Sequence, residues 1–136
     1  MNIQLSDLWT AAGILLGFQV TSFAARVNRE ISIGEKERIT WLPPADIVNL
    51  FSMFVLVIGI YILPVLGFAN QKFITYAFGL AVLLFIGYPF ALAAHYDMYN
   101  RKTKRSFEYF PYQEKVVVIT IAILAIAYVV IALIKR

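Results

Sequence analysis

The sequence predicts an all-α integral membrane protein, a bundle of four transmembrane helices, on three grounds. Hydrophobic residues make up 61% of the 136 residues and charged residues only 15%, against roughly 45–50% and about 25% in soluble domains. The mean hydropathy is +0.76. Uncharged apolar segments recur at the length of roughly 20 residues that crosses a bilayer. Four such spans use most of the chain, so we expect residues 1–136 to form a single membrane domain with no soluble catalytic part.

The first expected span, 8–25, is the weakest of the four because Thr10, Gln19 and two further hydroxyl residues dilute it. A secretory signal peptide would carry basic residues ahead of the apolar stretch. The preceding residues contain Asp7 and neither Lys nor Arg. We therefore expect a span here, the alternative being a helix that lies in the membrane interface.

The other three expected spans are 47–67, 73–94 and 116–134, and none of them contains a charged residue. Between the spans lie two longer connections, 26–46 and 95–115. These connections hold nine of the twelve basic residues. Because cytoplasmic loops of membrane proteins are enriched in Lys and Arg, the sequence predicts a multi-pass protein of the cell membrane with both long loops in the cytoplasm and both termini outside.

Residues 30–41 of the first connection alternate polar and apolar side chains around Gly34, a pattern typical of a short β-hairpin. A lone hairpin is only marginally stable in water, so it would have to lie against the bundle, the headgroups or a partner. The second connection either does the same or continues the third helix a turn or two beyond His95.

The two halves of the chain resemble each other at the entrances to the second and fourth spans. The residues 41–46 read Trp-Leu-Pro-Pro-Ala-Asp, and 109–114 read Tyr-Phe-Pro-Tyr-Gln-Glu, at an offset of 68. Arg26 and His95 follow Ala-Ala pairs at an offset of 69. Two parallel helical hairpins would explain this similarity. The alternative is convergence, because prolines and acids are favoured independently in first turns.

Small and weakly polar residues form one stripe along the first helix, with spacings of three and four residues. A GxxxG pair inside the stripe would let two helix backbones approach closely in a membrane. Three interpretations remain open: packing against another helix of the chain, packing between subunits of a homo-oligomer, or lining an aqueous pore. The stripe consists of Ser6, Thr10, Gly13, Gly17, Thr21, Ala24 and Asn28. Gln19 projects from the opposite side and requires a separate partner.

Asn49 and Ser52 are the deepest polar pair of the second span and are candidates for contact with a solute or ion. Pro64 and Pro89 are expected to bend the second and third helices. Such bends serve either as a movable gate or, more commonly, as packed kinks.

Catalytic and metal chemistry is poorly supported by the sequence. Cysteine is absent and His95 is the only histidine, so we expect no metal site, no cofactor and no enzymatic activity. His95, Asp97 and Arg101 are close in sequence where the third helix meets the cytoplasm, and a solvated histidine at the interface is the plainest interpretation. Asp46 and Glu114 fall in first turns at span ends, where they face the helix dipole. No acid is expected at membrane depth, which argues against a proton-coupled exporter.

A basic run occupies the second connection and comprises Arg101, Lys102, Lys104 and Arg105. Beside a cytoplasmic membrane face such a run sets topology and binds anionic headgroups. Docking of a cytoplasmic protein partner is a second interpretation, and binding of nucleic acid is not expected.

Three function classes follow from these features. The first is an oligomeric membrane subunit that forms or gates a pore, or anchors a cytoplasmic partner. The second is a small-solute carrier built from two parallel hairpins, with its solute pocket between them. The third is a membrane enzyme that acts on lipid through His95 and Asp97. The small stripe and the uncharged spans favour the first class, the possible repeat favours the second, and the sequence does not identify any transported species.

Overall fold

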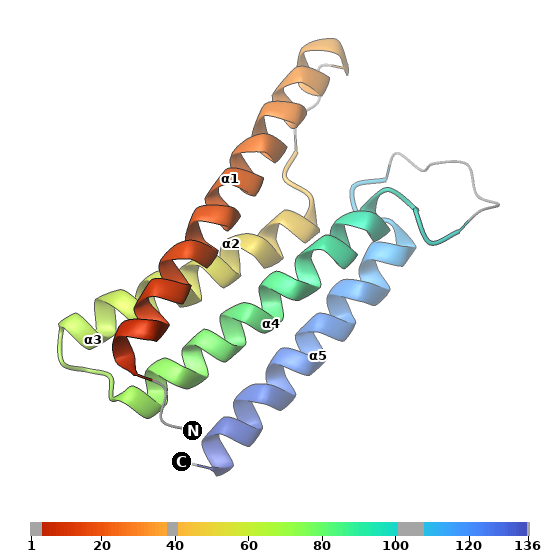
Figure 1. Cartoon of the computed structure of the whole chain (residues 1–136). Coiled ribbons are helices and arrows are strands. Elements are labelled where there is room, and N and C mark those ends of the chain that lie inside the picture. Colours follow the sequence, from red (N-terminus) through yellow and green to blue (C-terminus); the bar gives the residue numbers. More distant parts are fainter. Residues whose placement is uncertain (1–3, 38–40, 101–107, 136) are drawn as a thin grey trace.

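The computed structural model describes residues 4–37, 41–100 and 108–135, and every regular element in these ranges is helical. The elements are α1 (Leu5–Glu37), α2 (Pro44–Leu56), the π-helical segment η1 (Val57–Ile62), α3 (Leu63–Val65), α4 (Gln71–His95) and α5 (Tyr112–Ile134). In Figure 1 the four long helices run back and forth along a common direction.

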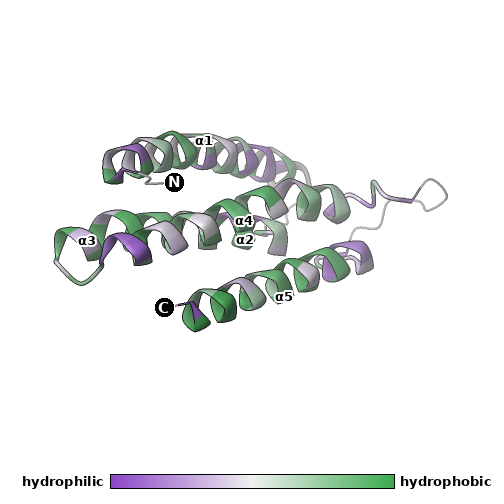
Figure 2. Ribbon diagram, turned by 60° about the horizontal axis from the view of Figure 1, so that its bottom comes forward, coloured by the Kyte–Doolittle hydropathy of each residue, from purple (hydrophilic) through white to green (hydrophobic). Residues whose placement is uncertain are grey.

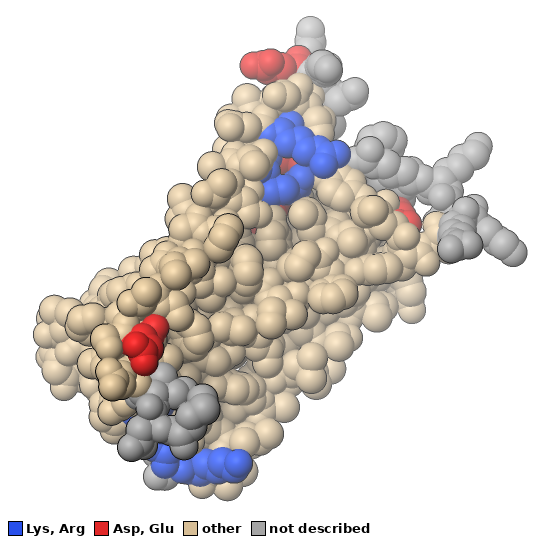
Figure 3. Space-filling view, in the orientation of Figure 1, with Lys and Arg blue, Asp and Glu red and all other residues tan. Residues whose placement is uncertain are grey.

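Four helical stretches are long and apolar enough to cross a bilayer: Leu5–Glu35, Pro44–Val65, Gln71–His95 and Tyr112–Ile134. The expectation of four spans is confirmed to that extent. Apolar residues cover much of the ribbon in Figure 2. In the face shown in Figure 3, Lys, Arg, Asp and Glu gather at the two ends and leave an uncharged belt between them. That distribution is typical of a protein whose middle faces lipid.

Each half of the chain forms a helical hairpin, α1 with α2 and its continuation, and α4 with α5. Both hairpins start from the same end, because α1 and α4 begin where the two termini and α3 lie (Figure 1). We call this the terminal end. The opposite end, where α1 and α4 finish and α2 and α5 begin, is the loop end. Contacts are most extensive between α2 and α4 and between α4 and α5, whereas α1 packs more lightly.

The hairpin expected around Gly34 is wrong for the described residues, because α1 continues through Glu37. Arg26 and Glu30 form an ion pair one turn apart, and the Ser32 hydroxyl donates to the Asn28 carbonyl oxygen. These local contacts stabilise a helical extension that needs no support from another element, whereas an isolated hairpin would need such support. Residues 38–40 lie outside the described part.

The second span is interrupted by η1, which ends two residues before Pro64. Proline has no N–H to donate to the carbonyl of residue 60, and its ring would crowd that carbonyl in a regular helix. The wider π-helical turn relieves this conflict. Pro89, by contrast, lies within the uninterrupted helix α4.

Glycine and aspartate end two helices in the same way. At the end of α3, Gly67 has φ +77° and the Phe68 N–H donates to the Leu63 carbonyl. At the end of α4, Asp97 has φ 53° and the Met98 N–H donates to the Ala93 carbonyl. This is the Schellman arrangement, in which the residue after the cap is left-handed. The helix therefore ends at His95 and does not continue into the loop.

Two apolar clusters hold the hairpins together. The cluster at the terminal end joins α1, α2, η1 and α4 and contains the buried residues Leu8, Ala12, Leu56, Ile60, Ile74, Ala77 and Ala81. The other joins α2, α4 and α5 around Ala45, Leu84, Ala91 and Ile121. Close approach of α5 depends on Gly87, where an added Cβ would lie 2.8 Å from the Ile121 side chain.

Candidate functional site: a buried polar cluster at the loop end

Arg26 of α1 and Asp46 of α2 form the centre of a buried polar cluster. Arg26 is 6% exposed and Asp46 is fully buried. The Arg26 Nη2 and Asp46 Oδ2 atoms are 3.3 Å apart, and Nη2 is also 2.9 Å from Glu30. The Tyr88 hydroxyl of α4 donates to Asp46 Oδ1 at 2.9 Å. Arg26 also donates to the hydroxyl of Tyr96, so this ion pair joins both hairpins.

His95 and Glu114 form a second pair, between α4 and α5. His95 Nδ1 is 2.8 Å from Glu114 Oε2, and Glu114 is fully buried. Because a carboxylate only accepts, the proton of this hydrogen bond belongs to the imidazole. The other oxygen, Oε1, accepts from the Ala45 N–H at 2.7 Å. Glu114 therefore binds one of the unpaired N–H groups at the start of α2.

The two pairs occupy equivalent places in the two hairpins. Arg26 and His95 are 69 residues apart, and Asp46 and Glu114, in the first turns of α2 and α5, are 68 apart. His95 is the last residue of α4, whereas α1 continues beyond Arg26 to Glu37. The preceding prolines adopt nearly the same backbone angles, φ −59° and ψ 149° at Pro43 and φ −60° and ψ 155° at Pro111. Independent selection of a proline and an acid at each helix start would not by itself pair each acid with a base of the preceding helix, as in Arg26–Asp46 and His95–Glu114. The geometry favours the two-hairpin interpretation.

A column of polar side chains continues from Asp46 into the bundle. Asp46, Asn49 and Ser52 follow at intervals of three residues, so they share one face of α2, and all are fully buried. Gln19 Nε2 of α1 donates to Ser52 Oγ at 2.6 Å. Ser52 Oγ donates to the Ala81 carbonyl of α4 at 2.7 Å. The column spans about 9 Å along α2 at 1.5 Å per residue.

Two side-chain oxygens in the column, Gln19 Oε1 and Asn49 Oδ1, are buried and have no hydrogen-bond donor among the described residues. Their assignment follows from the partners: Ser52 already donates to Ala81, so the Gln19 group facing it must be the donating NH2. Asn49 likewise donates from its Nδ2 to the main-chain carbonyl oxygen of Gln19 at 3.3 Å, which leaves its own Oδ1 as the group without a donor. An unsatisfied buried acceptor costs about 1–3 kcal/mol. The column therefore offers two acceptors to a ligand.

A depression of 260 Å³ between α1 and the start of α2 borders the column at Asp46. It is lined by Arg26, Glu30, Trp41 and Asp46 together with three aliphatic residues. At its other end the column stops at Leu56, the next residue on the same face and fully buried. Of Asp46, Asn49 and Ser52, only Asp46 lines the depression, and the apolar cluster at the terminal end follows the column beyond Ser52.

The small-residue stripe of α1 lies outside this site. All of its members are exposed, namely Ser6, Thr10, Gly13, Gly17, Thr21, Ala24 and Asn28. This exposure argues against packing of the whole stripe on another helix of this chain, although an added Cβ at Gly13 would lie 3.3 Å from the Tyr61 hydroxyl. The opposite face is buried because Gln19 and Arg26 require polar partners, whereas Thr10 and Thr21 satisfy their hydroxyls on carbonyls of α1 itself.

The other expected sites are placed as follows. The interpretation of His95 as a solvated histidine is wrong, since it is 9% exposed and bonded to Glu114. Asn49 and Ser52 are brought together with Gln19, and the need of Gln19 for a buried partner is confirmed. Asp46 and Glu114 do lie in first turns, but they are buried instead of facing water. The basic run Arg101, Lys102, Lys104 and Arg105 lies outside the described residues.

Sequence reasoning missed the pairing of Arg26 with Asp46 and of His95 with Glu114. A signal was present: Gln19 and Arg26 are seven residues apart, so two strongly polar side chains share one face of an otherwise apolar helix. Each of the expected spans 8–25 and 73–94 is followed directly by a base, and an acid precedes each of the expected spans 47–67 and 116–134. In a hairpin those two ends are neighbours.

Comparison with protein-family models, with curated proteins and with solved structures finds no match for this chain.

Proposed function

We propose that this chain is a membrane subunit that gates the passage of a small cation or hydrogen-bond-donating solute, with the column from Asp46 to Ser52 as its polar path. The observation that carries the proposal is the pair of buried oxygens, Gln19 Oε1 and Asn49 Oδ1, without donors. Polar groups inside a membrane bundle are expensive and typically mark solute or ion pathways.

The chemistry of the column favours a cation or a donor. Both unsatisfied groups are acceptors, and the fully buried acids Asp46 and Glu114 are balanced by one permanent cation, Arg26, and by His95, which is charged only when protonated. An anion would meet the carboxylate of Asp46 and two carbonyl oxygens. A cation or a donor finds complementary partners at each of these positions.

The apolar cluster at the terminal end supplies the gate. Leu56 and Ile60 are fully buried and follow Ser52 along the second span, with Leu8 and Ala12 of α1 and Ile74 of α4 around them. A hydrophobic constriction blocks water and ions by remaining dry. The described state is therefore a closed one, and opening requires these side chains to separate.

The test is flux through liposomes that contain the purified protein. Leu56→Ser places a small hydroxyl at the constriction and should produce a cation leak several-fold above that of the unaltered protein. Adding Asn49→Leu to this variant should suppress the leak again, because it removes an acceptor of the path. Phe54→Ser, at a residue 60% exposed on the same helix, serves as the matched control. Equal flux from Leu56→Ser and Phe54→Ser in folded protein would reject the proposal.

A carrier built from two parallel hairpins is a second candidate, favoured by the equivalence of the Arg26–Asp46 and His95–Glu114 pairs. In such carriers two structural repeats rock about a site between them. Contacts from Tyr88 to Asp46 and from Glu114 to Ala45 would have to break as the loop end opens. Flux that saturates with solute concentration and accelerates under counterflow would support the carrier over the pore.

Self-association through the exposed stripe of α1 belongs to the same proposal. Gly17 has nothing within 4 Å of an added Cβ, so a second helix has room to approach there. At the loop end the run Arg101–Arg105 is proposed to contact anionic headgroups or to anchor a cytoplasmic protein partner. We propose no catalytic role for His95, since Glu114 already occupies its Nδ1.

A further inference from the structure

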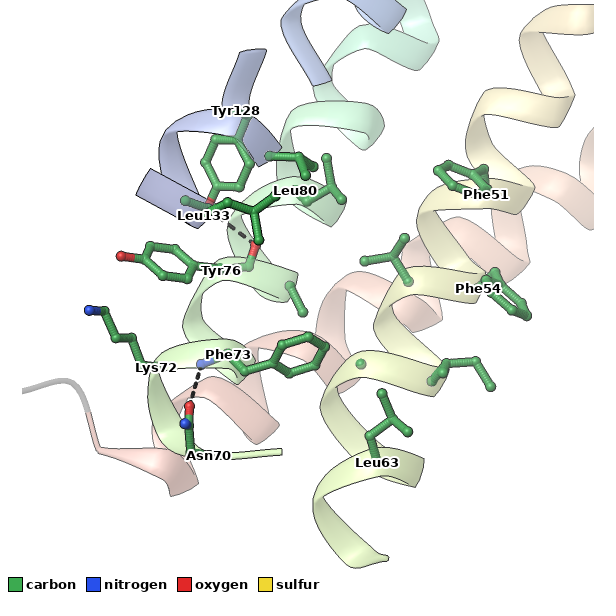
Figure 4. A pocket seen from close by; sticks show the side chains of 16 residues that line it. Phe51, Phe54, Leu63, Asn70, Lys72, Phe73, Tyr76, Leu80, Tyr128 and Leu133 are labelled. Carbon is green, nitrogen blue, oxygen red and sulfur yellow. Dashed lines mark hydrogen bonds between the residues drawn. The ribbon is translucent and has the colours of Figure 1, made fainter. Parts of the chain in front are cut away.

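A separate cavity of 590 Å³ lies in the terminal half of the bundle, between the two hairpins. Its walls come from α2 with η1 on one side and from α4 and α5 on the other. Figure 4 shows the Phe73 ring extending from α4 into the space between α4 and α2, and Leu80 and Leu133 close to Tyr128. The polar column does not reach this cavity: none of Gln19, Asn49 and Ser52 lines it.

The lining is almost entirely hydrocarbon. Phe51 and Phe54 of α2 are 53% and 60% exposed, and Phe73 is 42% exposed. The volume falls within the roughly 300–1,000 Å³ typical of small-ligand sites. The walls belong to three helical stretches long and apolar enough to span a bilayer, so what reaches this cavity from the side is lipid. A flexible alkyl chain has the apolar chemistry that the lining requires.

The amide and charged side chains of the lining lie where α4 begins. Asn70 and Lys72 line the cavity beside Tyr76, and Lys72 Nζ donates to the main-chain oxygen of Lys135 at the end of α5. The first turn of α4 contains no acid. The Asn70 side chain accepts from the Phe73 N–H, and the Lys72 ammonium together with the positive end of the helix dipole creates a positive potential at the rim. The carboxylate of Asp7 belongs to α1 and is not among the lining residues.

The π-helical segment shapes the wall opposite α4. Gly59 approaches α4 so closely that an added Cβ would lie 2.8 Å from the Ala77 Cβ. Ile58 and Gly59 both line the cavity. Single π-helical turns inside α-helices occur frequently at functional sites, and here the turn forms part of the wall of an apolar cavity.

We propose that this cavity binds one acyl chain of an anionic phospholipid, with the headgroup phosphate held at the rim by Lys72. The occupant is a lipid of the leaflet at the terminal end. Apolar lining accounts for the chain, and the rim charge accounts for the choice of headgroup. The site is independent of the polar column, so its failure leaves the proposed function standing.

The test compares retention of phosphatidylglycerol and phosphatidylcholine by the purified protein, measured by native mass spectrometry from mixed micelles. We expect on the order of fivefold preference for phosphatidylglycerol, the contribution of one lysine near a charged headgroup. Lys72→Gln should remove the preference and leave phosphatidylcholine retention unchanged. Lys115→Gln, at the loop end of α5, is the control and should retain it.

A second variant separates the chain from the headgroup. Leu80→Trp fills the cavity and should lower retention of both lipids, while thermal unfolding of the protein shows that it remains folded. Two results of the headgroup comparison would overturn the proposal. One is equal retention of the two lipids by the unaltered protein, and the other is loss of the preference in Lys115→Gln to the same extent as in Lys72→Gln. Unchanged retention in a folded Leu80→Trp protein would equally remove the cavity as the site.

Discussion

The buried ion pair between Arg26 and Asp46 is the residue-scale feature on which the loop end depends. Its charges are removed from water, and the arginine satisfies its remaining donors on Glu30 and Tyr96 while the aspartate also accepts from Tyr88. Such a network is stable only when every member is paired, because desolvation of a lone buried charge exceeds any remaining attraction.

Asp46→Asn should therefore destabilise the protein by about 3–5 kcal/mol, the usual cost of leaving one member of a buried pair uncompensated. The measurement is the free energy of unfolding in mixed micelles. Asp7→Asn, which neutralises an exposed acid in the first turn of α1, is the matched control and should change it by less than about 1 kcal/mol. A similar small effect for both variants would mean that Arg26 is not held by Asp46.

At the scale of elements, the same interaction is used twice. Arg26 within α1 and His95 at the end of α4 each meet an acid in the first turn of the following helix, and the second acid also binds the start of α2. These contacts fix how far each helix advances toward the loop end. Two glycines differ in their surroundings. Gly87 of α4 faces α5, where an added Cβ would meet Ile121, whereas Gly17 of α1 has nothing within 4 Å of an added Cβ.

Gly87→Ala should lower the free energy of unfolding by about 1–3 kcal/mol, because the added methyl would overlap the Ile121 side chain. Gly17→Leu should leave the stability of the single chain unchanged, since nothing lies within 4 Å of an added Cβ there. If the stripe on α1 mediates self-association, Gly17→Leu should also lower the oligomeric mass, measured by light scattering in detergent. The reverse assignment of the two glycines would contradict the described packing of α1 and α5.

For the whole molecule, the uncharged belt with polar ends is typical of a surface that faces lipid, and the distribution of basic residues predicts the sidedness. The absence of cysteine makes this testable with single introduced thiols. Ser32→Cys and Glu108→Cys report the loop end, and Phe68→Cys and Lys135→Cys report the terminal end. All four positions are exposed.

We expect an impermeant maleimide applied to intact cells to label Phe68→Cys and Lys135→Cys but neither loop-end variant. Permeabilisation should expose Ser32→Cys and Glu108→Cys, which shows that those thiols are reactive. Labelling of the loop-end variants from outside would invert the topology, and labelling of one variant from each end would contradict the arrangement of the two hairpins.

The sequence by itself determined the features of this protein that depend only on composition and local residue pattern. Four apolar segments, the prolines that open α2 and α5 and the near-repeat of their entrances were all visible, because span length, proline and first-turn acids are local properties that need no knowledge of neighbours. The continuation of α1 through Glu37 and the left-handed conformation of Asp97 could not be predicted from the sequence. At helix ends, helical and non-helical conformations differ little in free energy, so the end point is weakly specified.

Only the tertiary structure decided which side chains meet. Periodicity showed that the stripe from Ser6 to Asn28 shares a face, but not that this face points outward. Burial of Gln19 and Arg26 on the other side settled that question, because polar groups without water must find partners in another helix. The pairs Arg26–Asp46 and His95–Glu114 join residues about 20 positions apart, and the apolar cavity is assembled from three helices. Such contacts exist only once the hairpins have packed, because no single segment contains both partners.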